Sequence, residues 1–241
     1  MSIALIDGDM VAFRASFLAE NEIMWNDEYW TLHSEPSKMQ SEAIRHIEEL
    51  MDESNCDSVE LAFSSKSNFR KELNPLYKSN RKTKRKPLGL SSLIKWMSHE
   101  WSSHTIDQLE ADDVIGIMAS KPNNPYVAVS GDKDFKTIPC KFYDFTRKQF
   151  HEITKDEADF AHLCQTLAGD PTDGYSGLKG FGMVTATKYL DKHGATWDTV
   201  VDAFTSKGST ESEALLNARM AYILRHGDYN EKTKKIKLWN S

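Results

Sequence analysis

The chain has 241 residues, enough for one large domain or two modest ones, and 39% of them are hydrophobic. No run approaches the roughly 20 apolar residues of a membrane helix, and no basic-then-apolar segment opens the chain, so we expect no membrane span, no secretory signal and a cytoplasmic location. The net charge of −6 conceals an asymmetry, because residues 66–95 hold ten Lys or Arg and one acidic residue while the remaining chain carries −15.

The N-terminal part predicts a strand, a helix and a hairpin in turn. The apolar run at residues 3–7 predicts a buried strand, and residues 10–19 form an amphipathic stretch. Residues 21–37 are polar and aromatic, which is typical of a hairpin or loop. Apolar residues at helical spacing predict a helix over 39–53, with Ser41 as its cap.

The middle of the chain alternates strands with helices. Residues 59–63 predict a second strand, after which the chain turns basic. Residues 89–101 are amphipathic, and residues 107–119 predict a helix with acidic residues in its first turn, where the helix dipole favours negative charge. Residues 127–130 and 141–145 predict two further strands. This alternation implies a mostly parallel sheet.

The last third of the chain has a helical pattern. A turn rich in glycine and aspartate, residues 169–182, separates two predicted helices. Residues 232–239 are basic with apolar alternation and are expected to pack as an edge strand. We therefore divide the chain into two predicted domains, residues 1–155 and 156–241.

Acidic residues stand in tight groups at or near the ends of apolar runs. They are Asp7, Glu110, Asp112, Asp113, Asp132, Asp134, Asp170 and Asp173. Because strand ends converge at one edge of an α/β sheet, we expect the eight carboxylates to share one pocket. Like charges that close repel each other, and bound cations make such a cluster tolerable. Oxygen-rich sites suit Mg²⁺ or Mn²⁺, which indicates phosphoryl chemistry.

Each feature also has a plainer interpretation when taken alone. Residues 110–113 could be a solvated first helical turn, and residues 130–134 could be an Asx-type turn. The basic segment could be a solvated surface. The combination of these groups with Asp7 at a third strand end favours metal binding.

Two other features indicate how phosphate would reach such a pocket. Before a predicted helix, the glycine-rich turn exposes backbone N–H groups that can grip a phosphate or an ion. In the basic segment, the ring of Tyr77 could stack on a base while Lys78 and Arg81 hold phosphates. The glycines of the turn are Gly177, Gly180 and Gly182.

These motifs, in this order, resemble those of the 5′→3′ exonuclease and flap endonuclease family. They are Ile6-Asp7-Gly8-Asp9, Tyr77-Lys78-Ser79-Asn80-Arg81, Glu110-Ala111-Asp112-Asp113, Ser130-Gly131-Asp132-Lys133-Asp134 and Gly169-Asp170-Pro171-Thr172-Asp173. The phrases at residues 69–73, 134–139 and 173–177 resemble the stand-alone exonucleases of podovirus-type bacteriophages. The resemblance runs from about residue 3 to the C-terminus.

The resemblance implies a fold and a metal centre. The fold would be a PIN-like α/β nuclease core, with a mostly parallel sheet flanked by helices, a helical arch at about residues 66–95 and a C-terminal helical subdomain that binds duplex DNA. Two divalent ions, Mg²⁺ or Mn²⁺, would lie in the core. The first would be held by Asp7, Glu110 and Asp112, the second by Asp132, Asp134 and Asp173, with Asp112 near both and with Asp113 and Asp170 acting through water.

The resemblance also implies contacts with DNA. Tyr77 would stack on a base near the cleavage site, and Lys78 and Arg81 would touch the scissile phosphate, with Lys82 as a further DNA contact. Residues 177–182 match a helix–turn–helix element that grips the duplex backbone, often with a K⁺ ion. Lys179 and Lys188 would contact phosphates.

The expected activity is metal-dependent 5′→3′ hydrolysis of duplex DNA, with flap endonuclease and RNase H-type activity, in phage DNA replication or degradation. The expected partners are double-stranded DNA with a 5′ end or flap, an RNA–DNA hybrid and replication proteins, and the protein is expected to be a monomer. One alternative is a PIN-type ribonuclease, although such enzymes are usually shorter and lack the arch and the duplex grip. The other is a catalytically silent DNA-junction binder.

One departure from the family pattern affects the first metal position. The family usually places an Asp directly after the phenylalanine that ends the second strand, but here Phe63 is followed by Ser64 and Ser65. The first position would therefore lose one carboxylate. Asp9, or a water molecule held by Ser64, would have to compensate.

Overall fold

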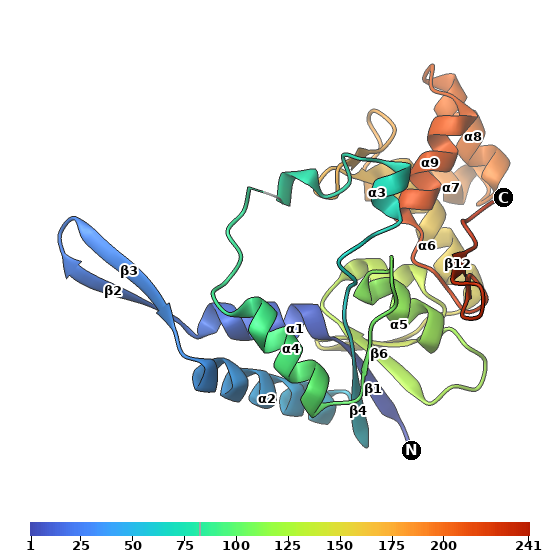
Figure 1. Cartoon of the computed structure of the whole chain (residues 1–241). Helices are drawn as coiled ribbons and strands as arrows, with labels where there is room; N and C mark the ends of the chain where they lie inside the picture. Colours follow the sequence, from blue (N-terminus) through green and yellow to red (C-terminus); the bar gives the residue numbers. More distant parts are fainter. Residues whose placement is uncertain (82) are drawn as a thin grey trace.

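The structure is a computed structural model that describes residues 1–81 and 83–241. A six-stranded sheet lies at its centre (Figure 1). From edge to edge the strands are β5 (Ser103–His104), β4 (Ser58–Ala62), β1 (Ile3–Asp7), β6 (Tyr126–Ser130), β7 (Lys141–Asp144) and β8 (Gln149–Glu152). All neighbours pair in parallel except β7 and β8, so the prediction of a mostly parallel sheet is confirmed.

The central strand β1 positions the functional end of the sheet. It pairs with β4 on one side, where Asp7 lies opposite Ala62, and with β6 on the other, where Ile6 lies opposite Val129. Because the three strands are parallel, their carboxyl ends meet at one edge of the sheet. The loops that follow β4 and β6 therefore start close to Asp7.

Helices cover both faces of the sheet because the side chains of β1 alternate between the faces. Ala4 and Ile6 pack into one apolar cluster, and Leu5 packs into the other. The first cluster lies under the helices α1 (Gly8–Leu18), α2 (Pro36–Glu53) and α4 (Leu90–Glu100). The second lies under α5 (Ala111–Ala119). The result is a layered α/β fold.

The C-terminal helices build a further apolar cluster, which includes Leu163, Leu167, Leu190 and Phe204. They are α6 (Lys155–Ala168), α7 (Met183–His193), α8 (Trp197–Ser206) and α9 (Glu211–Ala221). Two short ribbons accompany them, β9 (Gly169–Asp170) with β10 (Tyr175–Ser176) and β11 (Tyr229–Asn230) with β12 (Lys235–Ile236). The two predicted helices on either side of the glycine turn are confirmed, whereas the domain boundary at residue 155 stays a prediction.

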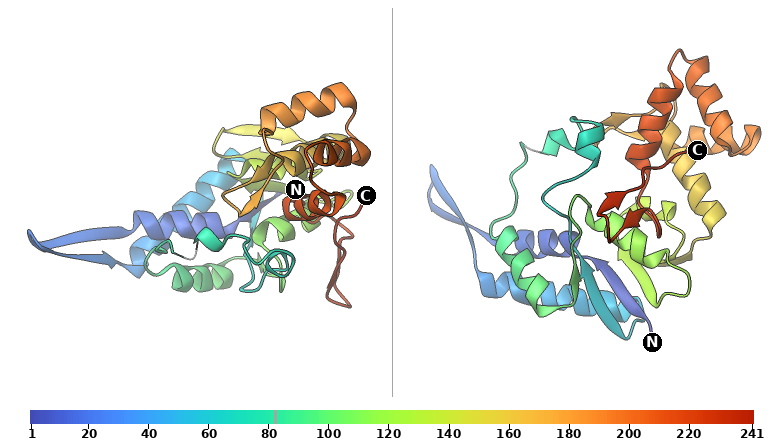
Figure 2. Two further views of the ribbon diagram at one scale, coloured as in Figure 1. Left: turned by 90° about the horizontal axis from the view of Figure 1, so that it is seen from above. Right: turned by 45° about the vertical axis from the view of Figure 1, so that its right-hand side comes forward.

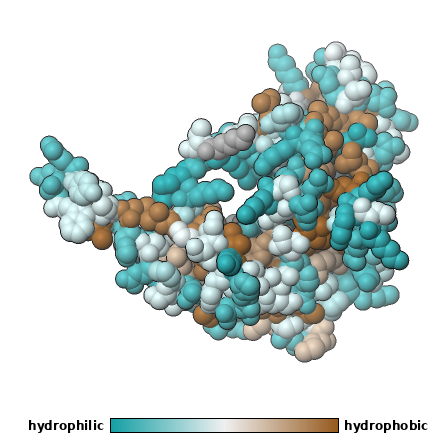
Figure 3. All heavy atoms as spheres, viewed as in Figure 1, coloured by the Kyte–Doolittle hydropathy of each residue, from teal (hydrophilic) through white to brown (hydrophobic). Residues whose placement is uncertain are grey.

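A hairpin extends away from the body of the molecule. It consists of β2 (Glu20–Asn26) and β3 (Tyr29–Ser34), and it confirms the hairpin alternative for this segment (Figures 1 and 2). Its tip exposes Trp25 and Trp30, and apolar side chains gather where the hairpin joins α1 (Figure 3).

The segment predicted to be a helical arch is mostly irregular. It crosses from the four-residue helix α3 (Arg70–Leu73) to α4, and its described residues form a 3-10 turn, η1 (Ser79–Arg81), on the way (Figures 1 and 2). Pro75 and Pro87 cannot donate helical hydrogen bonds, and the run of like charges between them repels itself. Lys82, predicted to contact DNA, lies outside the described residues.

Local chemistry overrides several predicted boundaries. Ser41 is not a cap, because α2 begins at Pro36 and the Ser41 hydroxyl donates to the Ser37 carbonyl within the helix. The helix predicted over 107–119 begins only at Ala111, because Gln108 has a φ of +65°. Strand β8 was not predicted, and the tail pairs with β11 instead of joining the edge of the main sheet. No helix in the described part of the chain is long and apolar enough to cross a membrane.

Candidate active site

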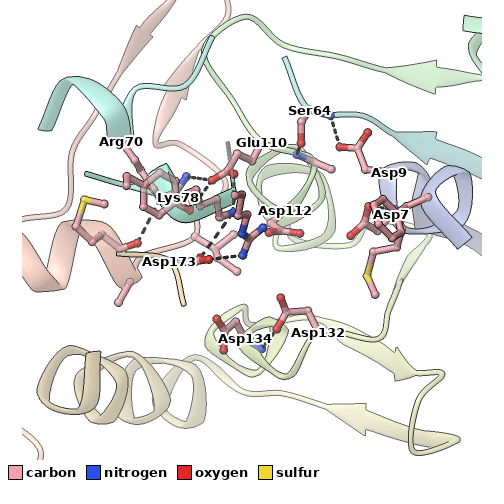
Figure 4. A pocket seen from close by; sticks show the side chains of 18 of the residues that line it. Asp7, Asp9, Ser64, Arg70, Lys78, Glu110, Asp112, Asp132, Asp134 and Asp173 are labelled. Atoms are coloured by element: carbon pink, nitrogen blue, oxygen red, sulfur yellow. Dashed lines mark hydrogen bonds and ion pairs between the residues drawn. The ribbon is translucent and has the colours of Figure 1, made fainter. Parts of the chain in front are cut away.

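A cavity of about 530 Å³ opens at the carboxyl ends of β1, β4 and β6 (Figure 4). Its lining includes seven acidic side chains: Asp7, Asp9, Glu110, Asp112, Asp132, Asp134 and Asp173. Six of the eight predicted carboxylates therefore do converge. The two that do not line the cavity are Asp113 and Asp170.

Asp7 is fixed by the turn from β1 into α1. Its Oδ1 accepts a hydrogen bond from the Met10 amide at 3.1 Å and caps the helix, and only 5% of the residue is exposed. Burial, with the neighbouring charge of Asp9, raises the pKa of Asp7 to about 7. Burial and the charge of Asp7 also raise the pKa of Asp112 well above its usual value. These two carboxyl groups oppose each other's ionisation across the cavity.

Asp132 and Asp134 come from the turn after β6. The Oδ1 of Asp132 accepts from the Asp134 amide at 2.9 Å and starts the 3-10 helix η2 (Lys133–Thr137). The plainer Asx-turn interpretation is thus correct for the backbone, and both side chains still line the cavity. Burial and the charge of Asp132 raise the pKa of Asp134 to about 6.

The lining fits a hard divalent cation in the chemistry of its donors. Carboxylate oxygens are the preferred ligands of Mg²⁺ and Mn²⁺, and burial together with the charges of neighbouring carboxylates raises the pKa values of Asp7 and Asp134. In residues 1–81 and 83–241, no three His, Cys, Asp or Glu side chains stand close enough to hold one ion. Metal binding therefore requires some of these side chains to turn toward one another.

Lys78 and Arg81 supply positive charge on the opposite wall. The Nζ of Lys78 lies 2.7 Å from Glu110 Oε1 and 3.6 Å from Asp173 Oδ2, and Arg81 pairs with Asp173. Lys78 has a φ of +51°, and its amide donates to the Asp173 carbonyl at 2.8 Å, which directs its side chain inward. Burial alone would raise the pKa of Glu110, but the charges of Lys78 and Arg70 lower it to about 2.

Asp113 does not take the metal-linked role predicted for it. It is fully buried, and both its oxygens accept hydrogen bonds from Arg70, each at 2.7 Å. Its oxygens also accept from the amides of Leu224 and Glu110. The carboxylate is thus saturated by protein donors, and it anchors α3 and the chain after α9 to the start of α5.

Tyr77 is also placed differently from its predicted role in base stacking. Its hydroxyl donates to Glu110 Oε2 at 2.8 Å, and its ring packs with Tyr175, Met220 and Ala221, leaving 4% of the residue exposed. The ring is therefore not open to a base in this arrangement, and its stacking role stays a prediction. Its hydroxyl instead orients Glu110.

The loop that holds Asp170 and Asp173 packs closely against the basic segment. Gly174 has a φ of +85°, and a Cβ there would lie 2.5 Å from the Leu76 carbonyl oxygen, so only glycine allows this approach. Asp173 reaches the cavity, whereas Asp170 accepts from the amide and hydroxyl of Thr172. The water-mediated role of Asp170 stays a prediction.

The three glycines of the turn divide into two kinds. A Cβ on Gly177 would lie 2.1 Å from the Ala168 carbonyl oxygen, so Gly177 serves close packing, and its contact with DNA stays a prediction. Gly180 and Gly182 face open space, and Gly182 is the N-cap of α7 without a side-chain cap. Lys179 and Lys188 are exposed. The open N-terminus of α7 and these two lysines keep the features expected of a phosphate grip.

Asp9 and Arg70 line the cavity but were not among the predicted site residues, and Asp9 was named only as a compensation for Ser64. The Ser64 amide donates to Asp9 Oδ2 at 2.9 Å (Figure 4). Arg70 donates to both Glu110 and Asp113. Asp9 had a signal in the sequence, since it stands two residues after Asp7 and Ser64 lacks a charge. Arg70 had only its place in a basic run.

The comparisons agree across sequence and structure. A family model described as "5'-3' exonuclease, N-terminal resolvase-like domain" matches residues 2–160. The exodeoxyribonuclease of Enterobacteria phage T3 is 34% identical, covering 98% of this chain and 92% of its own length. The exonuclease of Escherichia phage T7 is 33% identical, covering 98% and 93%. The solved T5 D15 protein, co-crystallised with metal ions, has a TM-score of 0.67 at 15% identity, covering 92% of this chain and 89% of that chain, which concerns the fold alone.

Proposed function

The chain belongs to the 5′-3′ exonuclease family and is a phosphodiester hydrolase, and we propose that its acidic cavity cleaves duplex DNA at or near a 5′ end with the help of divalent cations. The observation that carries this proposal is the convergence of seven carboxylates with Lys78 and Arg81 in one cavity. Such a lining suits a phosphate that must be held between metal ions and protein cations.

Two groups of carboxylates are assigned to two cations. Asp7, Glu110 and Asp112 would hold the first ion, and Asp132, Asp134 and Asp173 the second, with Asp112 near both. Two Mg²⁺ or Mn²⁺ ions bound there would activate the attacking water and stabilise the leaving 3′ oxygen.

The protein cations orient the substrate. Lys78 and Arg81 face the same carboxylates that the cations need, so an entering phosphate can take over their hydrogen bonds. They then place positive charge against the charge that develops on the phosphate during hydrolysis. Arg70 cannot do this, because Asp113 and the carbonyls of Met220 and Tyr222 hold its guanidinium.

The duplex is proposed to lie across the C-terminal helices, residues 156–241. Lys179, Lys188 and the open amides at the start of α7 would hold its backbone, with K⁺ at the 177–182 turn. An RNA–DNA hybrid as a second substrate, replication proteins as partners, a monomeric state and action in the cytoplasm of a phage-infected host belong to the same proposal. The phage enzymes among the relatives support this setting.

One assay tests the proposal. Labelled 5′-recessed duplex, flap, single-stranded DNA, RNA–DNA hybrid and RNA are offered with Mg²⁺ and with chelator. We expect 5′-phosphorylated products from the duplex and flap, in Mg²⁺ only. Asp112→Asn and Asp132→Asn should each abolish cleavage and retain DNA binding, whereas Asp27→Asn, an exposed hairpin residue, should cleave normally. Wild-type cleavage by both site variants would refute the assignment.

A further inference from the structure

The residues directly after β4, Phe63 to Ser65, bring no charged side chain to the cavity, although the strand ends beside the carboxylates. Ser64 lines the cavity there. The space next to it is taken by Asp9, from the first turn of α1 (Figure 4). Two elements that are far apart in the sequence thus meet at the point where a charge is lacking.

Ser64 is held in a position that serves Asp9. Its amide donates to Asp9 Oδ2 at 2.9 Å, while its hydroxyl oxygen accepts from the Ala111 amide at 3.0 Å. Ala111 is the first residue of α5, and Asp112 follows it. Ser64 therefore links the carboxylate of Asp9 to the helix that carries Asp112.

Asp9 has no cation of its own. Over residues 1–81 and 83–241, its hydrogen-bond partner is Ser64, it forms no ion pair, and the nearest cationic influence is the more distant charge of Lys78. The carboxylate is partly buried and lines the cavity with Asp7. A carboxylate removed from water without a cationic partner is costly. Asp9 is therefore placed as a ligand for a positive charge that enters the cavity.

We propose that Asp9 supplies a negative charge at the first metal position, in place of an acidic residue at position 64. In this arrangement Ser64 orients the Asp9 side chain through its backbone amide. The inference rests on the proposed function, since it concerns the same cations. It assigns Asp9 as a metal-facing residue and Ser64 as a positioning residue.

Binding of Mn²⁺ without DNA, followed by electron paramagnetic resonance, measures this role apart from activity. Asp9→Asn can still accept from the Ser64 amide but has no charge, and we expect it to weaken the tighter of two Mn²⁺ sites by about tenfold or more. Ser64→Ala keeps the amide and should change binding by less than about threefold. The double variant Asp9→Asn/Ser64→Asp returns the charge to the end of β4 and should regain most of the lost affinity. Asp27→Asn is the matched control and Asp7→Asn the positive control.

The outcomes separate the inference from the proposed function. If Asp9→Asn binds Mn²⁺ as the wild type does while Asp7→Asn does not, Asp9 has no such role. If the double variant regains nothing, the exchange between positions 9 and 64 is wrong. If Asp7→Asn and Asp112→Asn both retain Mn²⁺ binding and cleavage, the proposed function itself fails. Thermal unfolding in chelator verifies that each variant is folded, and Asp9→Ser replaces Asp9→Asn if that variant is not.

Discussion

The two walls of the cavity carry the same kind of side chain in opposite electrostatic settings. On the paired wall, Glu110 and Asp173 face Lys78 and Arg81, and the pKa of Glu110 falls to about 2, whereas burial still raises the pKa of Asp173. On the unpaired wall, carboxylates face one another, and the pKa of Asp7 rises to about 7. The unpaired wall consists of Asp7, Asp9, Asp112, Asp132 and Asp134, none of which forms an ion pair within the described residues.

The difference shows which charges the chain provides and which it leaves to solvent cations. Lys78 occupies the paired wall through a four-carbon stem, which can move aside when phosphate arrives. Within the described residues no Lys or Arg forms an ion pair with the unpaired wall, although Arg14 also lines the cavity, so divalent ions are its natural counter-charge. Glu110 and Asp173 then belong to both systems, because they can exchange Lys78 for a metal ion. Variants of the cations on the paired wall test this division.

The largest effect on stability is expected from Arg70→Met. Arg70 sits behind the paired wall, 3% exposed, and its loss leaves Asp113 buried without a cation. We expect the free energy of unfolding to fall by about 3–5 kcal/mol, measured by urea denaturation. As a control, substitution of the exposed neighbour in Lys71→Met should change the free energy of unfolding by less than about 0.5 kcal/mol. If Arg70→Met lowered the free energy of unfolding by less than about 1 kcal/mol, Asp113 would not depend on Arg70 as its buried counter-charge.

Lys78→Met should have the next largest effect, and it acts on catalysis. The side chain keeps its length but no longer offers charge to the substrate phosphate, so we expect hydrolysis to slow by about 100-fold. DNA affinity should change by only a fewfold, since the duplex grip lies elsewhere. Single-turnover cleavage and equilibrium binding separate the two. If the cleavage rate and the DNA affinity fell by the same factor, Lys78 would act in DNA binding and not in the chemical step.

The same variant tests whether Lys78 and metal ions can exchange. Without Lys78, Glu110 and Asp173 lose a shared cation, so the metal-free protein should melt at a lower temperature than the wild type. Added Mg²⁺ should restore more stability to Lys78→Met than to the wild type. An equal gain for both proteins would contradict the exchange.

The sequence predicted the convergence of the acidic groups because strand ends are local features. Asp7 and Asp132 follow apolar runs that form β1 and β6, and parallel strands bring such ends together. The sheet, the hairpin and the C-terminal helices follow from periodicity in the same way. Boundaries were less predictable where one residue decides them, as with the left-handed conformation of Gln108.

The sequence could not distinguish Asp112 from Asp113. Both stand in the first turn of α5, and only the fold shows that Arg70 reaches Asp113 from 43 residues earlier in the chain. The role of Tyr77 was equally hard to predict, because the sequence does not distinguish a ring that stacks on DNA from a ring buried against Tyr175. Roles set by long-range packing need the structure.

The unpaired wall predicts how metal-free stability depends on pH. The pKa of Asp7 is about 7 in the folded chain against an ordinary value of 3.8, so between these values the native state binds more protons than the unfolded state. The free energy of unfolding should therefore fall as pH rises from 5 to 7.5, and Asp134, with a pKa of about 6, adds to the trend. Glu110 acts oppositely, but its contribution is lost only below pH 4.5.

Calorimetry in chelator should show this as a fall in Tm of at least about 2–4 °C across that range. Saturating Mg²⁺ should flatten the curve, because bound cations keep the carboxylates ionised. Asp7→Asn should make it shallower in chelator, since the amide does not titrate and only Asp134 still contributes. A wild-type Tm that rises with pH over the same range would contradict the raised pKa of Asp7.

The smallest effect is expected from Arg81→Met, which compares the two cations of the paired wall. Arg81 and Lys78 both face Asp173, but Arg81 is 53% exposed and Lys78 only 18%. An exposed pair is screened by water, so stability should change by less than about 1 kcal/mol. Cleavage should slow by about fivefold, well short of the loss in Lys78→Met, because water can replace an exposed guanidinium more readily than a buried ammonium. If both variants lose the same rate, burial does not set the strength of the paired wall, and the two cations act on the phosphate as equals.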